Sequence, residues 1–136
     1  MKKQNILFIC KYNRFRSKIA EAYFKKINKN KNLKVKSAGI IKGSPLSKFQ
    51  KAVAKEKGIK IKGPPQGLST KLLKWQNVVI IVADDVPKSI FKENEKYGKK
   101  TIVWNLPDVF TENKKETKKT ISAIMKKVEE LVRELK

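Results

Sequence analysis

The sequence predicts an α/β fold in three layers, α/β/α, with a four-stranded parallel sheet between the helices. Two observations carry this prediction. Four short apolar runs alternate along the chain with segments whose apolar residues recur at helical spacing. Two of the runs, 5–10 and 78–82, are almost continuously apolar, which is typical of strands buried on both faces of a parallel sheet. A doubly wound sheet with right-handed crossovers is therefore expected.

The first half of the chain supplies two strands and two helices. Residues 5–10 form the first strand, and residues 17–28 follow with apolar side chains at helical spacing. Apolar residues alternate with lysines over 33–37, so this strand should be more exposed. Residues 46–57 carry an apolar helical stripe, and Gly58 is a suitable residue to end that helix.

The second half continues the alternation. Ser69 is expected to cap a short helix that ends at Trp75, and residues 78–82 form the most clearly buried strand. A helix is expected over 87–98, because proline is favoured in the first turn and glycine at the end. Residues 99–104 supply the fourth strand. The long amphipathic segment 114–136 then closes the domain.

Length and composition indicate one domain, 1–136, because 136 residues suffice for a single core and no linker or repeat is apparent. The hydrophobic fraction of 40% is globular, and no apolar run approaches the ~18 residues needed to cross a bilayer. Met1-Lys2-Lys3 precedes only a short apolar run, so we expect no signal peptide. The single cysteine excludes an internal disulfide framework and favours a cytoplasmic location.

The loop between the first strand and the first helix has the residues for phosphate chemistry. Five residues separate Cys10 from Arg16, and Ser17 follows directly. Backbone N–H groups in such a loop can turn inward around an oxyanion, and the positive end of the next helix points to the same place. The guanidinium of Arg16 can hold two oxygens, and these positive groups also favour the nucleophilic thiolate of Cys10. The pattern therefore predicts a loop that binds phosphate and attacks it.

A purely structural interpretation makes Cys10 a small hydrophobic residue at the end of a strand and the loop arginines mere surface charge. Arginine usage argues against it. Only three of the 34 Lys and Arg residues are arginine, and two of the three, Arg14 and Arg16, lie in this loop. Planar, bidentate recognition of phosphate is the task that requires arginine rather than lysine.

The loop and three further segments resemble the low-molecular-weight protein tyrosine phosphatases, in the same order and over nearly the whole chain. The further segments are Ala20-Glu21, Ser37-Ala38-Gly39 and Leu106-Pro107-Asp108. The family's loop reads Cys-x-Gly-Asn-x-Cys-Arg-Ser-Pro, and here Tyr12, Phe15 and Lys18 replace the glycine, the second cysteine and the proline. The nucleophile, guanidinium and hydroxyl remain, so the resemblance implies activity. Phe15 leaves an oxidised Cys10 without a partner for an internal disulfide.

The resemblance implies a role for each site residue. Cys10 would attack the phosphorus, Arg16 and the loop amides would hold the transferring group, and Asp108 would protonate the leaving oxygen. Asp108 follows the fourth strand and so should lie at the sheet edge that holds the Cys10 loop. The expected substrate contacts are Lys11, Tyr12, Asn13, Arg14, Phe15, Ser17 and Phe110. The substrate would be a phosphorylated protein or a small aryl phosphate, and the chemistry requires no cofactor and no metal.

Several of these residues also have a local explanation. Ser17 could donate to the Cys10 sulfur, cap the helix, or both. Asn13 could hold the loop through its side chain, or be present because asparagine tolerates left-handed backbone. Asp108 could be an ordinary turn residue. The resemblance implies that residues near 41–49 form one wall of the substrate cleft, but Phe49 itself is expected in the core.

The region around residues 58–67 and the acidic pair give two further expectations. Family members often carry a histidine in this region, under the loop, and this chain has no histidine, so a supporting network would have to use other groups. Asp84 and Asp85 are expected to cap the following helix rather than to bind a metal, because acidic residues at a helix start interact with its dipole.

The formal net charge of +22 should attract anions in general, with a strong dependence on salt. The lysines are spread along the chain, without the clustered arginines and interleaved aromatics of a dedicated nucleic-acid surface. We therefore expect a solvated basic surface, with non-specific nucleic-acid binding at most and no membrane partner. No pattern defines an oligomeric state.

Two other functions are compatible with the same loop. An arsenate reductase would need an external thiol, because Cys10 is the only cysteine and cannot take part in an internal thiol relay. A phosphate-binding or nucleic-acid-binding relative would keep the loop without turnover. Tyr12, Val109 and the high charge keep this second alternative open, and a Cys10-dependent rate would exclude it.

Overall fold

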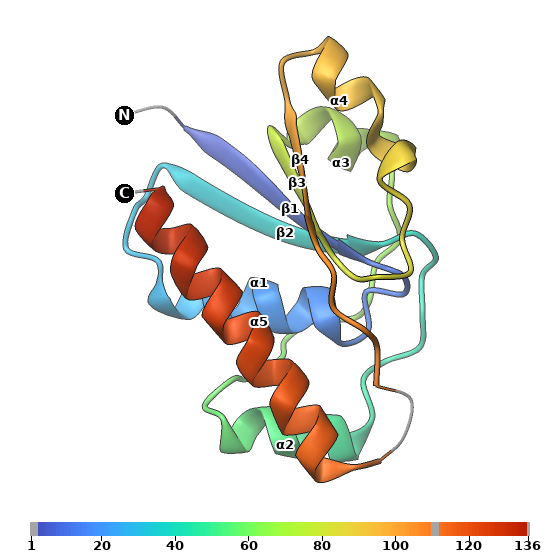
Figure 1. Ribbon diagram of the computed structural model, residues 1–136, viewed down its shortest axis with the longest axis vertical. Coiled ribbons are helices and arrows are strands. Elements are labelled where there is room, and N and C mark those ends of the chain that lie inside the picture. The colour runs from blue at the N-terminus through green and yellow to red at the C-terminus, as the bar shows by residue number, and fades with distance from the viewer. Residues whose placement is uncertain (1–2, 110–111, 136) are drawn as a thin grey trace.

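The computed structural model describes residues 3–109 and 112–135 and shows the three-layer α/β fold (Figure 1). Its sheet contains four strands, and every neighbouring pair is parallel. The strands are β1 (Gln4–Cys10), β2 (Leu33–Gly39), β3 (Val78–Val82) and β4 (Lys100–Trp104). Their order across the sheet is β2-β1-β3-β4. The predicted four-stranded parallel sheet is confirmed, and each strand end differs from its expected position by at most two residues.

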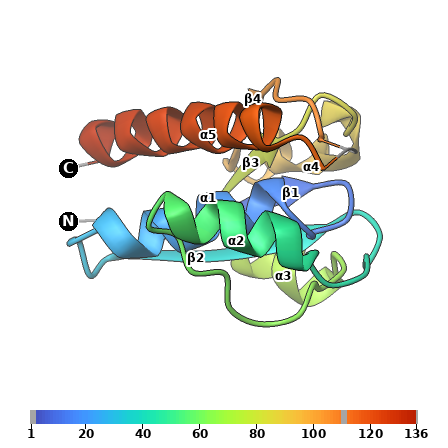
Figure 2. The ribbon, with the colours of Figure 1, turned by 90° about the horizontal axis from the view of Figure 1, so that it is seen from below.

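The helices are α1 (Arg16–Ile27), α2 (Lys48–Glu56), α3 (Thr70–Trp75), α4 (Glu93–Lys96) and α5 (Lys114–Glu134), with a 3-10 helix η1 (Lys88–Phe91). Helices α1, α2 and α5 lie together on one side of the sheet (Figures 1 and 2). Ser69 accepts a hydrogen bond from the backbone N–H of Leu72, so it caps α3 as predicted.

The apolar residues divide into two clusters, one on each face of the sheet. Alternate residues of β1 point to opposite faces, as in any strand. Ile6 and Phe8 pack with apolar residues of α1, α2 and α5. Leu7 and Ile9 pack instead with Leu72 of α3 and with residues that follow β3. Both faces of β1 are thus fully covered, which explains its continuous apolar sequence.

The predicted helix over 87–98 is wrong in detail, because the segment divides into η1 and α4. Each of the two pieces has one buried residue, Phe91 in η1 and Asn94 in α4. The Asn94 side chain donates to the carbonyl of Lys100 and to the Thr101 hydroxyl. These contacts tie the segment to the start of β4.

The central position of β1 determines where a ligand can bind. The chain leaves β1 toward β2 on one side and later returns to β3 on the other side. Loops at the carboxyl ends of β1 and β3 therefore diverge, and such a switch point opens a crevice in parallel α/β sheets. Among the described residues, no helix is long and apolar enough to cross a membrane.

Candidate active site

The loop that the sequence predicts to bind phosphate, residues 11–15, connects the carboxyl end of β1 to the start of α1 at this crevice. Cys10 is 2% exposed, and the segment after β2 runs beside the loop. The backbone N–H groups of Ile40 and Ile41 donate to the carbonyls of Cys10 and Lys11, at 3.2 and 2.9 Å. A Cβ atom on Gly39 would lie 2.5 Å from the carbonyl carbon of Tyr12, so only glycine allows this approach. The Ser-Ala-Gly segment thus supports the loop from one side.

The hydroxyl of Ser17 contacts the sulfur of Cys10, with an Oγ to Sγ distance of 2.9 Å. The same oxygen accepts a hydrogen bond from Asn13 Nδ2 at 2.8 Å. Since an accepted bond leaves the hydroxyl proton free to point elsewhere, Ser17 is placed to donate to the sulfur. The helix-cap alternative for Ser17 is wrong: Phe15 occupies the cap position of α1, and no side chain makes the cap bond there.

Asn13 is the centre of a buried network behind the loop. Its φ of 52° is left-handed, and its side chain is fully buried and hydrogen-bonded. The Nδ2 group donates to the hydroxyls of Ser17 and Ser37, and the Oδ1 atom accepts from the backbone N–H of Gln66 at 2.9 Å. Both explanations of Asn13 are therefore correct: the residue adopts left-handed backbone, and its side chain holds the loop.

The network continues away from the loop without a histidine. Ser37 donates to Glu21 at 2.6 Å, and the Gln66 side chain donates to the carbonyl of Ser37 at 2.7 Å. Gln66 lies in the region where relatives often carry the histidine, so the expectation that other groups take its place is met. Glu21 and Gln66 could not be assigned from the sequence, because their partners are 16 and 29 residues away in the chain.

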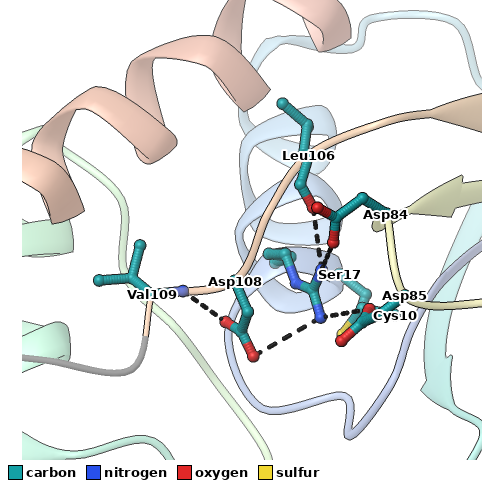
Figure 3. Close-up of polar contacts among 8 residues, drawn as sticks. Cys10, Ser17, Asp84, Asp85, Leu106, Asp108 and Val109 are labelled. Atoms are coloured by element: carbon teal, nitrogen blue, oxygen red, sulfur yellow. Dashed lines mark hydrogen bonds and ion pairs between the residues drawn. The ribbon is translucent and has the colours of Figure 1, made fainter.

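The guanidinium of Arg16 is 1% exposed and lies among three carboxylates (Figure 3). Its Nη2 donates to Asp85 at 3.0 Å and lies 3.5 Å from Asp108, and its Nη1 lies 3.8 Å from Asp84. Nη1 also donates to the carbonyl of Leu106 at 2.9 Å. These contacts fix the guanidinium at the carboxyl edge of the sheet, next to Cys10.

The expectation that Asp84 and Asp85 cap a helix is wrong. The cap position of η1 is Pro87, and no side chain makes a cap bond there. Both aspartates follow β3, the neighbour of β1, and reach the buried guanidinium of Arg16 at the same sheet edge. Their position after β3 places them at the same sheet edge as Asp108, but that position alone does not distinguish a helix cap from a partner of Arg16. Among the described residues, no group of three His, Cys, Asp or Glu side chains could hold a metal ion.

A cavity of about 250 Å³ opens in front of the loop. Six of the predicted site residues line it: Cys10, Tyr12, Arg14, Phe15, Arg16 and Asp108. The side chains of Asn13 and Ser17 are buried behind the cavity, where they hydrogen-bond to each other and Ser17 contacts the Cys10 sulfur. The Nζ atom of Lys11 lies 5.3 Å from the centre of the Tyr12 ring. Phe110 lies outside the described residues.

The cavity has further lining residues beyond the assigned site residues, and two of them, Ser47 and Phe49, lie in the stretch 41–49 that the resemblance implies as a cleft wall. The further residues come from α2 and its cap, and from the segment beyond β4: Ser47, Phe49, Gln50, Val109 and Glu112. Phe49 also packs against the core, so it belongs both to the core and to the cavity wall. The helical stripe of α2 could not separate these two roles, because periodicity shows which residues face inward but not which of them border a cavity.

Asp108 lies at the cavity wall with 16% of its side chain exposed. Its Oδ1 accepts a hydrogen bond from the backbone N–H of Val109 at 2.9 Å, which orients the carboxylate. Figure 3 shows its Oδ2 directed to the guanidinium of Arg16. The Asp108 carboxylate, the Arg16 guanidinium and the Cys10 thiol therefore line one cavity from separate parts of the chain.

This fold and this loop define a class of proteins that handle oxyanions at a cysteine held between a strand and a helix. The chain belongs to the low molecular weight phosphotyrosine protein phosphatase family, whose model matches residues 5–136. No curated protein gives a match to the sequence.

Solved structures agree on the fold. A low molecular weight protein tyrosine phosphatase from T. tengcongensis is 24% identical, with a TM-score of 0.84 over 97% of this chain and 99% of that one. The YwlE arginine phosphatase from Geobacillus stearothermophilus is 23% identical, with a TM-score of 0.82 over 97% and 92%. An arsenate reductase from Archaeoglobus fulgidus is 21% identical, with a TM-score of 0.71 over 93% and 98%. The shared fold thus serves both phosphatases and arsenate reductases.

Proposed function

We propose that the protein is a cysteine-dependent phosphatase that hydrolyses phosphate monoesters, with phosphotyrosine or another aryl phosphate as substrate. One observation carries the proposal: Cys10, Arg16 and Asp108 line the same cavity. Each supplies a different part of the reaction, namely the nucleophile, the oxyanion clamp and the acid. The phosphorylated substrate is the expected partner, and the reduced thiol that the reaction needs favours the cytoplasm.

The reaction proceeds in two displacements. The Cys10 thiolate attacks phosphorus and the bond to the leaving oxygen breaks, while Arg16 and the loop amides hold the equatorial oxygens. Asp108 gives its proton to the leaving oxygen, and its carboxylate then takes a proton from the water that attacks the cysteinyl-phosphate. This second step releases phosphate and restores the thiolate. The Ser17 hydroxyl lies 2.9 Å from the sulfur, where it can donate a hydrogen bond that stabilises the thiolate before attack and on departure.

The walls of the cavity support an aryl substrate. Three of its lining residues, Tyr12, Phe15 and Phe49, are aromatic. Aromatic pairs contribute about 0.5–1.5 kcal/mol beyond the area that they bury. Arsenate reduction would need an external thiol, because Cys10 is the only cysteine.

The experiment is hydrolysis of aryl phosphates across pH and salt by the wild type, Cys10→Ser, Arg16→Ala and Asp108→Asn. The first two changes should abolish measurable turnover, and the third should slow it by about 10²- to 10³-fold, the usual contribution of a general acid. Asp84→Asn is the matched control, because Asp84 also contacts Arg16 but does not line the cavity. It should retain most of the rate.

The leaving group separates the acid role of Asp108 from a structural one. Phenyl phosphate needs protonation of its leaving oxygen far more than p-nitrophenyl phosphate does, so Asp108→Asn should slow phenyl phosphate the more strongly. Equal losses of rate on both substrates would show that Asp108 is not the general acid. A wild type that binds phosphate or vanadate without any turnover would instead indicate a non-catalytic anion-binding protein, and arsenate-dependent thiol oxidation would indicate a reductase.

A further inference from the structure

A second cavity, of about 620 Å³, lies between α1 and the segment 58–66 that leads from α2 toward α3. It shares no lining residue with the catalytic cavity. Its size lies within the range of about 300–1,000 Å³ that is typical of sites for small molecules. Glu21 and Gln66 in its wall belong to the network behind the loop, but no residue of the cavity takes part directly in the proposed reaction, so the cavity requires a separate explanation.

Five lysines line this cavity: Lys18, Lys25, Lys26, Lys60 and Lys62. The single acidic residue in its wall is Glu21, which already pairs with Lys25 at 3.0 Å and accepts a hydrogen bond from Ser37. Among the described residues, Lys25 is the only one of the five lysines with a carboxylate partner. The wall is therefore strongly positive, and a hollow concentrates such a field more than a flat surface does.

Lys18 distinguishes this cavity from an ordinary lysine-rich surface. The residue is only 7% exposed, although lysine is almost never buried without a partner. Its ammonium contacts the carbonyl of Lys62 at 3.5 Å, the limit of a hydrogen bond. Lys18 also replaces the proline that ends the family's loop motif, so this charge is a departure of this chain. A buried ammonium with so weak a contact would be stabilised by a bound anion.

The other residues of the wall indicate that a ligand would have an apolar part as well as charges. Ala22, Ile59 and Pro64 provide an apolar part beside the lysines. The ammonium groups suit an extended anion better than a single one, because they come from both α1 and the 58–66 segment. A chain of linked phosphates presents such a row of charges, and a ring attached to it could cover the apolar part.

We propose that this cavity binds a small molecule with a chain of two or more phosphate groups, at a site separate from the catalytic loop. Inorganic polyphosphates and nucleoside triphosphates share this chemistry. Lysine ammonium groups bind phosphate as compact point charges, as the lysine of nucleotide-binding P-loops does. The proposal does not depend on whether the catalytic loop hydrolyses its substrate.

The test is a titration of the full chain, labelled for NMR, with inorganic tripolyphosphate and separately with ATP. The backbone amide signals of Lys18, Ile59, Lys60, Lys62 and Gly63 should shift together and saturate, independently of any shifts at residues 11–16. Shifts with both ligands would show that the phosphate chain alone is recognised. Shifts with ATP alone would show that binding also needs contact between the ring of the ligand and the apolar part of the wall. No saturating shifts at these residues with either ligand would overturn the proposal.

Matched variants separate the cavity from the general positive field. Lys60→Gln/Lys62→Gln removes two exposed lysines from the cavity, and Lys126→Gln/Lys127→Gln removes two exposed lysines from α5, outside it. The first pair should raise the tripolyphosphate Kd by roughly tenfold, and the second should change it less than about twofold. Equal weakening by both pairs would show that only net charge matters and would refute the site. Lys18→Met should weaken binding at least as much as the first pair, while binding of inorganic phosphate to the catalytic loop persists.

Discussion

The positive charge of Arg16 lies where water hardly reaches it, and the protein balances this charge with aspartates from two different loops. Asp84 and Asp85 follow β3, whereas Asp108 follows β4. A charge buried without partners costs several kcal/mol, so these carboxylates are needed to hold the guanidinium in place. Of the pair after β3, Asp85 makes the closer contact, at 3.0 Å against 3.8 Å for Asp84.

Asp85 should therefore act as a positioning residue for Arg16. Asp85→Asn removes the charge from the 3.0 Å contact and leaves a weaker acceptor, so the guanidinium can leave its productive orientation. We expect kcat for an aryl phosphate to fall roughly tenfold, with a smaller change in KM. Asp84→Asn, the same substitution one residue earlier, should change kcat less than about twofold. Equal effects of the two variants on kcat would argue against this role for Asp85.

Among the secondary-structure elements, the sequence predicts best the bounds of those strands that have a clear local pattern of apolar residues. Strand β3 is apolar throughout, and its bounds were predicted to the residue. The end of β1 at Cys10 was also correct, because the apolar run gives way there to polar loop residues. Periodicity and burial have the same physical cause, so such elements can be recognised without knowledge of the rest of the chain.

The sequence could not predict contacts that depend on sheet register. The Asp85 carboxylate meets Arg16 across 69 residues of chain, and a pair of aspartates before a proline looks the same whether it caps a helix or binds a guanidinium. Ser17 likewise looked like a helix cap, but the first turn of α1 begins one residue earlier and turns its hydroxyl to Cys10. Cys10, Arg16 and Asp108 could be predicted because the loop motif and the expected position at one sheet edge both indicate these residues.

Gly39, the last residue of β2, should control the shape of the phosphate-binding loop. An added Cβ would lie 2.5 Å from Tyr12 C and 2.6 Å from Asn13 N, and both atoms belong to the backbone and cannot rotate away. Gly39→Ala should lower the free energy of unfolding by about 1–3 kcal/mol, the usual cost of overpacking, and should also reduce turnover. Urea denaturation and an aryl phosphate assay measure the two effects.

Gly67 provides the control for this substitution. It forms a parallel bridge with Gly39, and the nearest atoms to an added Cβ, on Lys42, lie at 3.7 Å. Gly67→Ala should therefore leave stability and turnover close to those of the wild type. A tolerated Gly39→Ala, or equal losses for the two variants, would contradict the close approach of β2 to the loop.

The contact between α1 and α5 should make stability depend on pH in the alkaline range. Tyr23 of α1 donates to Glu129 of α5, and this hydrogen bond, with burial and the charge of Glu129, raises the pKa of Tyr23 to about 12. The unfolded phenol ionises near pH ~10. Below that pH the stabilisation is fully present, and it is lost as the pH rises toward 12, because the unfolded chain releases its proton first.

Tyr23→Phe isolates this contribution. The wild type should be more stable than the variant at about pH 8, and the difference should shrink steadily above pH ~10. Urea unfolding of both proteins at several pH values measures the difference, and titration of the lysines cancels in the comparison. Tyr97→Phe, at a tyrosine that is 68% exposed, should leave the free energy of unfolding unchanged. A difference for Tyr23→Phe that is constant with pH would contradict the linkage.

At the scale of the whole molecule, the net charge of +22 surrounds a catalytic cavity whose own charges are nearly balanced. Two of its charged lining residues, Arg14 and Arg16, are positive, and the other two, Asp108 and Glu112, are negative. The excess positive charge therefore lies outside the loop, on the lysines of the surface. Such a field attracts anionic partners over a distance but adds little to the contacts made at the phosphorus.

The dependence of activity on salt should therefore differ between large and small substrates. The charges of an acidic phosphotyrosine peptide lie beyond the cavity, within reach of salt, since the Debye length falls from about 10 Å at 0.1 M to about 3 Å at 1 M. Raising NaCl from about 0.05 to about 0.5 M should lower kcat/KM for this peptide roughly tenfold, through KM, because several surface contacts are screened. For p-nitrophenyl phosphate, whose charge is held inside the loop, the same change should have an effect of less than about threefold. A neutral phosphotyrosine peptide of equal length separates charge from size: it should follow p-nitrophenyl phosphate, and if it follows the acidic peptide instead, the surface lysines do not guide substrate.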